Sequence, residues 1–224
     1  MQNGSQLSLD TEASNTNCAF CQRSSIAANI LQETPTFLIV ADHAPLVEGH
    51  ILIIPKQHYA CFGAMPAELD VEIQTLKQQV QQFFDQFYAP IVFWEHGIFR
   101  QSVFHAHLHC FPFGVTRYDV NEKVHNLVVH SQDDIRAWYA TRGQYFYMED
   151  ASGAVLFAPE MERYFHIVKN VLAAGASARS QQTGWRSQQQ RYQEGGPLIK
   201  ATSDKWQVFQ QQQGANYVDE TSAR

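Results

Sequence analysis

Positive charges are scarce in this chain. Its 224 residues include 16 Lys and Arg against 22 Asp and Glu, a formal net charge of −6 at pH 7. A broad nucleic-acid surface needs clustered Lys and Arg that neutralise phosphates. The composition therefore argues against a nucleic-acid partner, although it stays compatible with a local basic pocket.

Cysteines and long apolar runs are also few. The four cysteines, Cys18, Cys21, Cys61 and Cys110, do not form the dense pattern of a secreted disulfide scaffold. The first residues, Met-Gln-Asn-Gly-Ser-Gln, lack the apolar stretch of a signal peptide. No segment is long and apolar enough to span a membrane, and no repeat period is visible. We therefore expect a cytoplasmic protein without a membrane partner.

The pattern of apolar residues predicts strands around one long helix. Strands are expected at 36–41, 50–55, 91–95 and 103–111. Residues 66–88 carry apolar side chains at helical spacing, with a proline and acidic residues in the first turn. This order predicts an α+β fold in which one long helix crosses an antiparallel sheet.

We divide the chain into four segments, which are 1–16, 17–114, 115–175 and 176–224. The first is polar and is expected to be loosely ordered, and the second would form the main domain. The third is an extension in which a hairpin is predicted, followed by a helix from Met161 to Ala174.

The last segment, the tail at 176–224, is rich in Gln, Ser and Gly. Such a composition is typical of a poorly ordered chain or of short surface elements. The tail nevertheless contains Trp185 and Trp206, which a fully disordered segment rarely needs. We expect these rings to anchor it against the domain or a partner.

The most informative pattern lies at residues 102–112. His105, His107 and His109 alternate there with Phe104 and other apolar residues, Ala106, Leu108 and Cys110. A strand sends successive side chains to opposite faces, so three imidazoles would share one face and the apolar residues the other. Packing alone does not require three titratable rings on one face. The pattern therefore predicts a phosphate-handling or metal site.

This chain resembles the histidine triad (HIT) superfamily of nucleotide-binding hydrolases and transferases. The match consists of His-x-His-x-His at 105–109, of the segment 48–58 with Gly-His-Ile-Leu-Ile-Ile-Pro-Lys-Gln-His, and of Cys18-Ala-Phe-Cys21. The three motifs stand in the family's order and cover roughly residues 17–113. The resemblance implies a HIT-like antiparallel sheet and a nucleotide-type substrate.

The resemblance also implies roles for the histidines. His107 matches the nucleophile that attacks the α-phosphate and becomes a nucleotidyl-histidine. A neutral imidazole suits this role near pH 7. His109 matches the residue that holds and protonates the phosphate, and His50 matches a further histidine beside it. Because the uridylyltransferase branch has glutamine at the position of His109, the histidine favours hydrolysis over transfer.

Three further residues are candidates for substrate binding. Ser102 matches a serine that contacts phosphate, and otherwise it simply starts a strand. Asp42 matches an acid that binds the ribose hydroxyls, but an Asx turn before Pro45 explains it equally well. Arg100 lies in a loop that departs from the family pattern. It could replace lost phosphate donors or be a solvated loop residue.

A second departure concerns Trp94, which stands where many hydrolase members carry an asparagine. It leaves the base preference and the leaving group undetermined. His96, close to it in the Glu-His-Gly segment, could also touch the substrate.

Cys18 and Cys21 have the spacing of zinc ligands. The resemblance implies that His58 and His105 complete the site. On a strand, residues two apart are roughly 6.6 Å apart and residues four apart roughly 13 Å, so one ion would not bind the whole triad. Four protein ligands leave no open position, so the zinc would be structural. The alternatives are an unliganded thiol pair and a thioredoxin-like redox motif.

The expected function is therefore hydrolysis of a nucleotide at its α-phosphate, with a nucleoside phosphoramidate or a dinucleoside polyphosphate as the substrate. A nucleotidyltransferase is the nearest alternative. Others are an aprataxin-like deadenylase, a non-catalytic nucleotide-binding module and a zinc hydrolase with metal-bound water. The acidic balance disfavours the deadenylase, and an intact triad is unnecessary for binding alone.

The long helix also suggests a homodimer. Its apolar residues Val71, Val80, Phe83, Phe84 and Phe87 span more of the circumference than one core-facing stripe needs. HIT hydrolases that resemble this chain are commonly homodimers. The alternative is that the tail covers the same arc within one chain, through Trp185 or Trp206.

Overall fold

The computed structural model describes residues 18–114, 126–167, 172, 175 and 187–222. It confirms the α+β prediction. The eight described strands form one antiparallel sheet with the order β1-β2-β3-β5-β4-β7-β8-β6. In that order the strands are β1 Ile30–Glu33, β2 Phe37–Ala41, β3 Ile51–Pro55, β5 Leu108–Phe111, β4 Val92–Glu95, β7 Phe146–Asp150, β8 Gly153–Phe157 and β6 Asn126–Val129.

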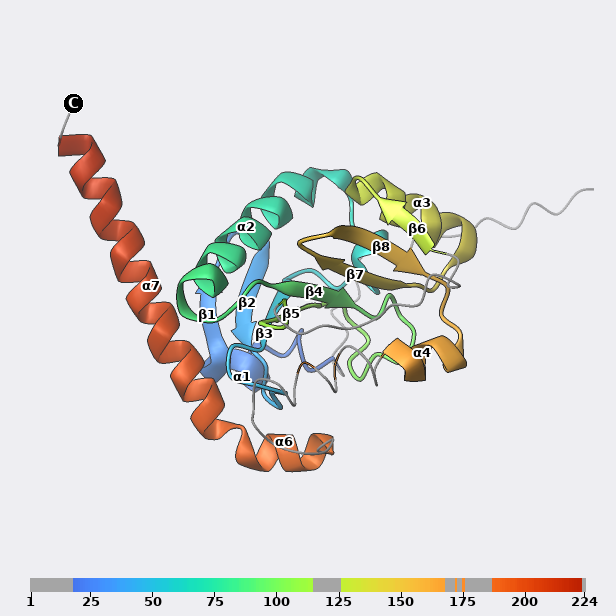
Figure 1. The fold of residues 1–224 in the computed structure, drawn as a ribbon, viewed down its shortest axis with the longest axis horizontal. Helices are drawn as coiled ribbons and strands as arrows, with labels where there is room; N and C mark the ends of the chain where they lie inside the picture. The colour runs from blue at the N-terminus through green and yellow to red at the C-terminus, as the bar shows by residue number, and fades with distance from the viewer. Residues whose placement is uncertain (1–17, 115–125, 168–171, 173–174, 176–186, 223–224) are drawn as a thin grey trace, which may run out of the picture.

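Helices surround this sheet (Figure 1). The long helix α2 crosses one face, and α7 runs past the β1 end of the sheet. The helices are α1 Arg23–Ile26, η1 Ala27–Asn29, η2 Phe62–Ala64, η3 Ala67–Leu69, α2 Asp70–Phe87, α3 Gln132–Arg142, α4 Met161–Ile167, α6 Gln188–Glu194 and α7 Gly196–Ser222. Of the helices that the structure describes, none is long and apolar enough to cross a membrane.

Helix α2 covers the core as its sequence pattern predicted. The 3-10 turn η3 leads into it, and its first turn carries Asp70 and Glu72, whose charges suit a helix N-terminus. The buried side chains of α2 recur at helical spacing and are Ile73, Leu76, Val80, Phe83 and Phe84. They pack on alternate residues of β4 and β5, including Phe93 and Cys110.

The strand predicted at 103–111 is shorter than expected. Pairing of β3 with β5 starts at Ile53 and Leu108, and the Ala106 N–H donates to the Tyr59 carbonyl instead of to a strand. His105 and His107 therefore precede the strand. Phe104, expected on the core face, is 62% exposed. This part of the prediction is wrong, because the chain turns here to bring His105 to the Cys18 segment.

The same sheet continues beyond residue 114. Strands β7 and β8 form the predicted hairpin, and β7 pairs with β4 through Phe93 and Glu149. Strand β6 and helix α3 were not predicted. Helix α3 begins with a capping box formed by Ser131 and Asp134, which is a readable sequence signal. Helix α4 starts at Met161 as predicted, but most of the stretch between Ile167 and the predicted end at Ala174 lies outside the described residues.

The described part of the tail, residues 187–222, is mostly helical, and its buried side chains pack on the domain. Trp206 and Phe209 are each 1% exposed, and the Trp206 ring lies 4.8 Å from the Phe83 ring between centroids. The tail thus covers the Phe83 part of the apolar arc of α2 within one chain, as the alternative interpretation proposed, whereas Val71 is 79% exposed. The arc no longer supports a homodimer, which stays a prediction. Trp185 lies outside the described residues.

Candidate active site

Two cysteines and two histidines meet beside β3. The Cys18 Sγ lies 3.4 Å from the His105 Nδ1, and the Cys21 Sγ lies 3.4 Å from the His58 Nδ1. All four ligand atoms lie within 4.8 Å of one another. A turn brings the thiols together, closed by a hydrogen bond from the Gln22 N–H to the Cys18 carbonyl. These are the four residues predicted as metal ligands.

The protonation of His105 suits a metal ligand. Its Nε2 lies 2.7 Å from the Pro55 carbonyl, which can only accept, so Nε2 must carry the proton. The Nδ1 lone pair then faces Cys18 and Cys21. Burial is the main cause that lowers the pKa of His105 to about 4, which keeps the ring neutral. Two cysteine thiols and two histidine rings in this geometry fit a closed zinc site.

The next histidine, His107, has the opposite tautomer. Its Nδ1 donates to the His105 carbonyl at 2.6 Å, so the lone pair is on Nε2. The side chain is buried, and burial lowers its pKa. His107 is therefore a neutral imidazole near pH 7, and its unprotonated nitrogen points away from the backbone that orients it.

A relay of hydrogen bonds also defines the tautomer of His109. The Leu46 N–H donates to the His50 Nδ1 at 3.3 Å, so His50 carries its proton on Nε2. That proton is donated to the His109 Nδ1 at 2.9 Å, which leaves the proton of His109 on Nε2. Burial lowers the pKa of His50 to about 4 and that of His109 well below its usual range. His107 thus offers a lone pair and His109 a donor, with ring centroids 4.9 Å apart.

Asp42 lies at the other side of His50. Its Oδ1 accepts from the Ala44 N–H at 2.7 Å, which is the Asx turn considered from sequence. Its Oδ2 lies 3.6 Å from the His50 Nε2. The turn orients the carboxylate, and the ribose contact stays a prediction.

These groups line one pocket of about 250 Å³. The six residues predicted for catalysis and substrate binding all line it, namely Asp42, His50, Arg100, Ser102, His107 and His109. Ser102 and Arg100 are exposed at its rim. The Arg100 guanidinium lies 5.2 Å from the centre of the Tyr164 ring, so Arg100 is partly held by stacking.

Sequence reasoning missed several lining residues, among them Tyr164, Gln188 and Arg191. No local signal marks them, because they come from α4 and α6, far along the chain. Trp94 and His96 also line the pocket. Among the described residues, Trp94 Nε1 and His96 Nδ1 find no hydrogen-bond partner, and burial lowers the pKa of His96 to about 4.

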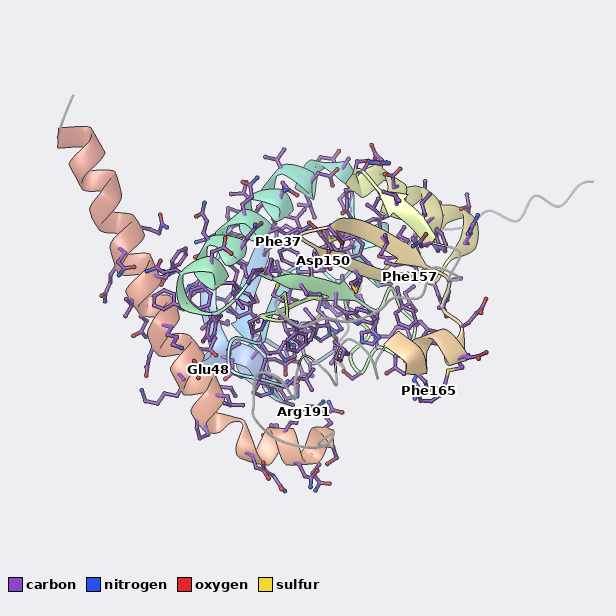
Figure 2. The ribbon with its side chains drawn as sticks, in the orientation of Figure 1. Phe37, Glu48, Asp150, Phe157, Phe165 and Arg191 are labelled. Atoms are coloured by element: carbon purple, nitrogen blue, oxygen red, sulfur yellow. The ribbon has the colours of Figure 1, made fainter. Side chains whose placement is uncertain are left out.

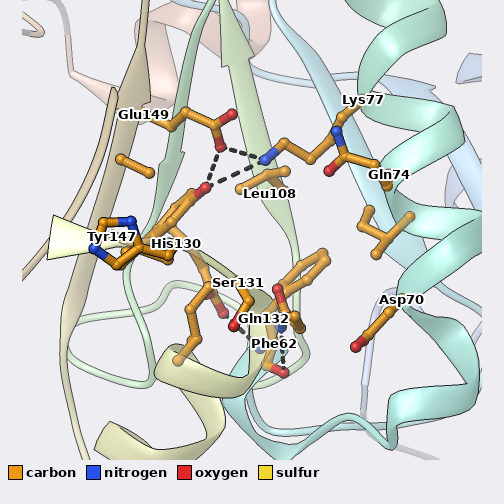
Figure 3. Close-up of a pocket in the computed structure, with 15 residues that line it drawn as sticks. Phe62, Asp70, Gln74, Lys77, Leu108, His130, Ser131, Gln132, Tyr147 and Glu149 are labelled. Atoms are coloured by element: carbon orange, nitrogen blue, oxygen red, sulfur yellow. Dashed lines mark hydrogen bonds and ion pairs between the residues drawn. The ribbon is translucent and has the colours of Figure 1, made fainter. Parts of the chain in front are cut away.

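A larger cavity of about 400 Å³ lies on the opposite face of the sheet, under α2 (Figure 3). Several of its polar groups are paired with nearby side chains. The Lys77 ammonium contacts Glu149 and Tyr147. The Arg136 guanidinium donates a bidentate pair of hydrogen bonds to the Asp70 carboxylate, at 2.8 and 2.6 Å. The smaller pocket, with its poised histidines, is therefore the better candidate for chemistry.

Comparisons with known proteins identify chains of similar sequence. Residues 8–126 match the family model described as protein similar to CwfJ C-terminal. An uncharacterized HIT-like protein of Methanocaldococcus jannaschii is 33% identical over 102 residues, which cover 42% of this chain and 78% of that protein. The adenosine 5'-monophosphoramidase hnt1 of Schizosaccharomyces pombe is 31% identical over 97 residues, covering 42% of this chain and 73% of that protein.

Solved structures with similarity include a zinc-bound histidine triad family protein from Mycobacterium smegmatis. It is 25% identical, with a TM-score of 0.37, and the match covers 55% of this chain and 94% of that one. A HIT family protein from Bacillus anthracis is 26% identical, with a TM-score of 0.39, over 53% of this chain and 86% of that one.

The fold, the triad and the sequence relatives define the class, which is that of the histidine triad proteins, as the motifs predicted. Within that class, the chain belongs to the family described as protein similar to CwfJ C-terminal.

Proposed function

We propose that this protein hydrolyses a nucleotide at its α-phosphate through a nucleotidyl intermediate on His107. One observation carries the proposal, namely the complementary tautomers of His107 and His109. The backbone carbonyl of His105 leaves the His107 Nε2 unprotonated, and His50 leaves the His109 Nε2 protonated. A nucleophile therefore lies beside a hydrogen-bond donor in one pocket, as phosphoryl transfer requires.

The steps follow from these two nitrogens. The His107 Nε2 lone pair forms a bond to the α-phosphorus, and the bond from phosphorus to the leaving group breaks. The leaving group departs with the bonding electrons and takes up a proton from solvent, and the water that attacks in the second step returns one proton to solvent. The His109 N–H stabilises a phosphoryl oxygen, and the His105 carbonyl stabilises the charge that develops on His107. Water then attacks the phosphorus, which frees His107 and releases the mononucleotide.

The substrate class is supported by sequence similarity. The S. pombe relative is named as an adenosine 5'-monophosphoramidase, and it is 31% identical to this chain. A nucleoside phosphoramidate is therefore the first candidate substrate, and a dinucleoside polyphosphate is the second. Hydrolysis is preferred over transfer because position 109 is a histidine, where the uridylyltransferase branch has a glutamine.

A zinc ion bound by Cys18, Cys21, His58 and His105 would complete the site. Such an ion would act as a structural cross-link between the N-terminal segment and the chain before β5. His105 would then connect the metal site to His107. Its ring is held by the metal ligands, and its carbonyl accepts a hydrogen bond from the His107 Nδ1.

The test is turnover of a panel of adenylated and guanylated compounds, followed by release of mononucleotide. His107→Ala should abolish turnover while leaving nucleotide affinity within a modest factor. Intact-mass analysis of the wild type at low pH should show a nucleotidyl adduct that His107→Ala lacks. His130→Ala is the matched control, since His130 is exposed and lies outside the pocket. Near-normal turnover by His107→Ala would refute the covalent mechanism.

A further inference from the structure

The C-terminal helices reach the pocket of the triad. Arg191 of α6 lines it together with Asp42, His50 and His109. Figure 2 shows Arg191 on the side of α6 that faces the rest of the protein. The family match ends at residue 126, so α6 lies outside the matched region. We propose that Arg191 is a substrate-binding residue that holds the anionic phosphoryl group of the nucleotide. This inference rests on the proposed function and deepens it.

Charge is the first argument. His50, His107 and His109 are neutral near pH 7, because burial lowers their pKa values, so these rings add no positive charge to the pocket. The permanent charges among the residues that line it are Asp42, Arg100 and Arg191. Arg100 is exposed at the rim, whereas Arg191 is partly buried. Two guanidinium groups against one carboxylate give the pocket a net positive charge, which suits the doubly charged phosphate of a nucleotide.

The placement of Arg191 is the second argument. Its Nε donates to the Ala44 carbonyl at 3.0 Å, which holds the guanidinium against the loop that carries Asp42. The joint between α6 and α7 touches the same loop, because a Cβ on Gly195 would lie only 2.6 Å from the Pro45 Cδ. The positive charge of Arg191 acts on His50 and His109, where it contributes to their lowered pKa values. The guanidinium therefore lies within electrostatic reach of the triad.

Helix α7 fixes this arrangement in place. The Gly49 N–H donates to the buried Thr202 hydroxyl at 2.9 Å, and the Lys205 Nζ lies 2.6 Å from the Glu48 carboxylate. Both contacts join α7 to the residues just before His50. Trp206 anchors the same helix in the core. Arg191 is thus preorganised relative to His50, so that little ordering is needed when a phosphate binds.

The test compares each mononucleotide with its nucleoside in equilibrium binding to the full-length chain. The probes are AMP with adenosine and GMP with guanosine. Arg191→Gln should weaken binding of the preferred mononucleotide about ten- to hundred-fold, the loss expected for a hydrogen bond to a charged group. Affinity for the nucleoside should stay within about twofold, because a nucleoside has no phosphate.

Three controls sharpen this comparison. Arg191→Lys keeps the positive charge but lacks the planar guanidinium that can bind a phosphate with two hydrogen bonds. It should lose less affinity for the mononucleotide than Arg191→Gln. Lys200→Gln removes an exposed cation on α7 that pairs only with Asp204 among the described residues, and it should change nothing. Salt should weaken mononucleotide binding to the wild type more than to Arg191→Gln. Melting temperatures verify that each variant is folded.

Equal losses for mononucleotide and nucleoside would overturn the assignment, since Arg191 would then shape the pocket without holding phosphate. Unchanged mononucleotide affinity in a folded Arg191→Gln would overturn it as well. Neither result affects turnover through His107. Wild-type protein that binds and cleaves no nucleotide would refute the proposed function, and the role of Arg191 with it.

Discussion

Glu95 provides a sharp test of how burial controls the stability of this fold. Its carboxylate is 0% exposed under α2, where it accepts from the Phe62 N–H at 2.8 Å and from the Tyr145 hydroxyl at 2.7 Å. Burial outweighs both hydrogen bonds and raises the pKa of Glu95 from 4.5 to about 7. The native state therefore holds this proton more tightly than the unfolded chain does.

The sign of the effect follows from linkage. Below pH 4.5 both states carry the proton, so Glu95 adds no pH dependence. As the pH rises from 4.5 to 7, the unfolded chain releases the proton first, and the native state loses stability. The free energy of unfolding falls in total by roughly 3 kcal/mol, because the pKa of Glu95 shifts from 4.5 to about 7 and each pKa unit corresponds to about 1.4 kcal/mol. Glu95→Gln removes this loss, because the amide does not ionise.

The assay is urea unfolding of the wild type and of Glu95→Gln between pH 4 and pH 8. Buried histidines have an opposite pH dependence, because their lowered pKa values reduce stability as the pH falls below 6.5. The difference between the two proteins cancels that contribution. It should rise by roughly 3 kcal/mol in favour of Glu95→Gln from pH 4.5 to 7. Glu68→Gln, at an exposed position, should give a flat difference. A flat difference for Glu95→Gln would refute the reasoning.

Three further predictions concern the metal, the tail and the relay. Purified protein should carry about one zinc per chain, which is the stoichiometry of one four-ligand site. Cys18→Ser should lower both the zinc content and the melting temperature. Metal-free protein of full stability would contradict this prediction. Trp206→Ala should lower the free energy of unfolding measured in urea by about 3–5 kcal/mol. It should also promote association, measured by light scattering, because it uncovers Phe83. The control Val208→Ala, at a 42% exposed position, should cost little. His50→Phe should lower kcat more than it raises KM, because His109 loses its tautomer partner, and an unchanged kcat would exclude the relay.

Local patterns in the sequence were sufficient for several strands of the sheet and for the long helix that covers it. Strand β3, helix α2 and the hairpin of β7 and β8 lie close to their predicted bounds, because their apolar residues follow the period of one secondary structure. The His-x-His-x-His pattern was read as a strand over its whole length, and this was wrong before Leu108. Two of its histidines precede the strand, since one must reach Cys18 and Cys21.

The roles within the site needed coordinates. Nothing in the sequence tells which nitrogen of His107 carries the proton, because a backbone carbonyl and a neighbouring ring decide it. The Asx turn at Asp42 likewise depended on where the Ala44 N–H lies. Spacing along the chain predicts proximity, but it does not predict the direction of a hydrogen bond.

The sequence by itself determined the histidine triad class, the α+β fold class and six of the residues that line the pocket, because motifs and apolar periods are local properties of the chain. The tertiary structure alone decided what the C-terminal tail does. The tail's Gln-rich composition hides the contacts of Trp206 with Phe83 and of Arg191 with Ala44, which join residues more than a hundred positions apart. Such contacts arise from the packing of a whole helix against the core, and a local window of sequence does not contain them.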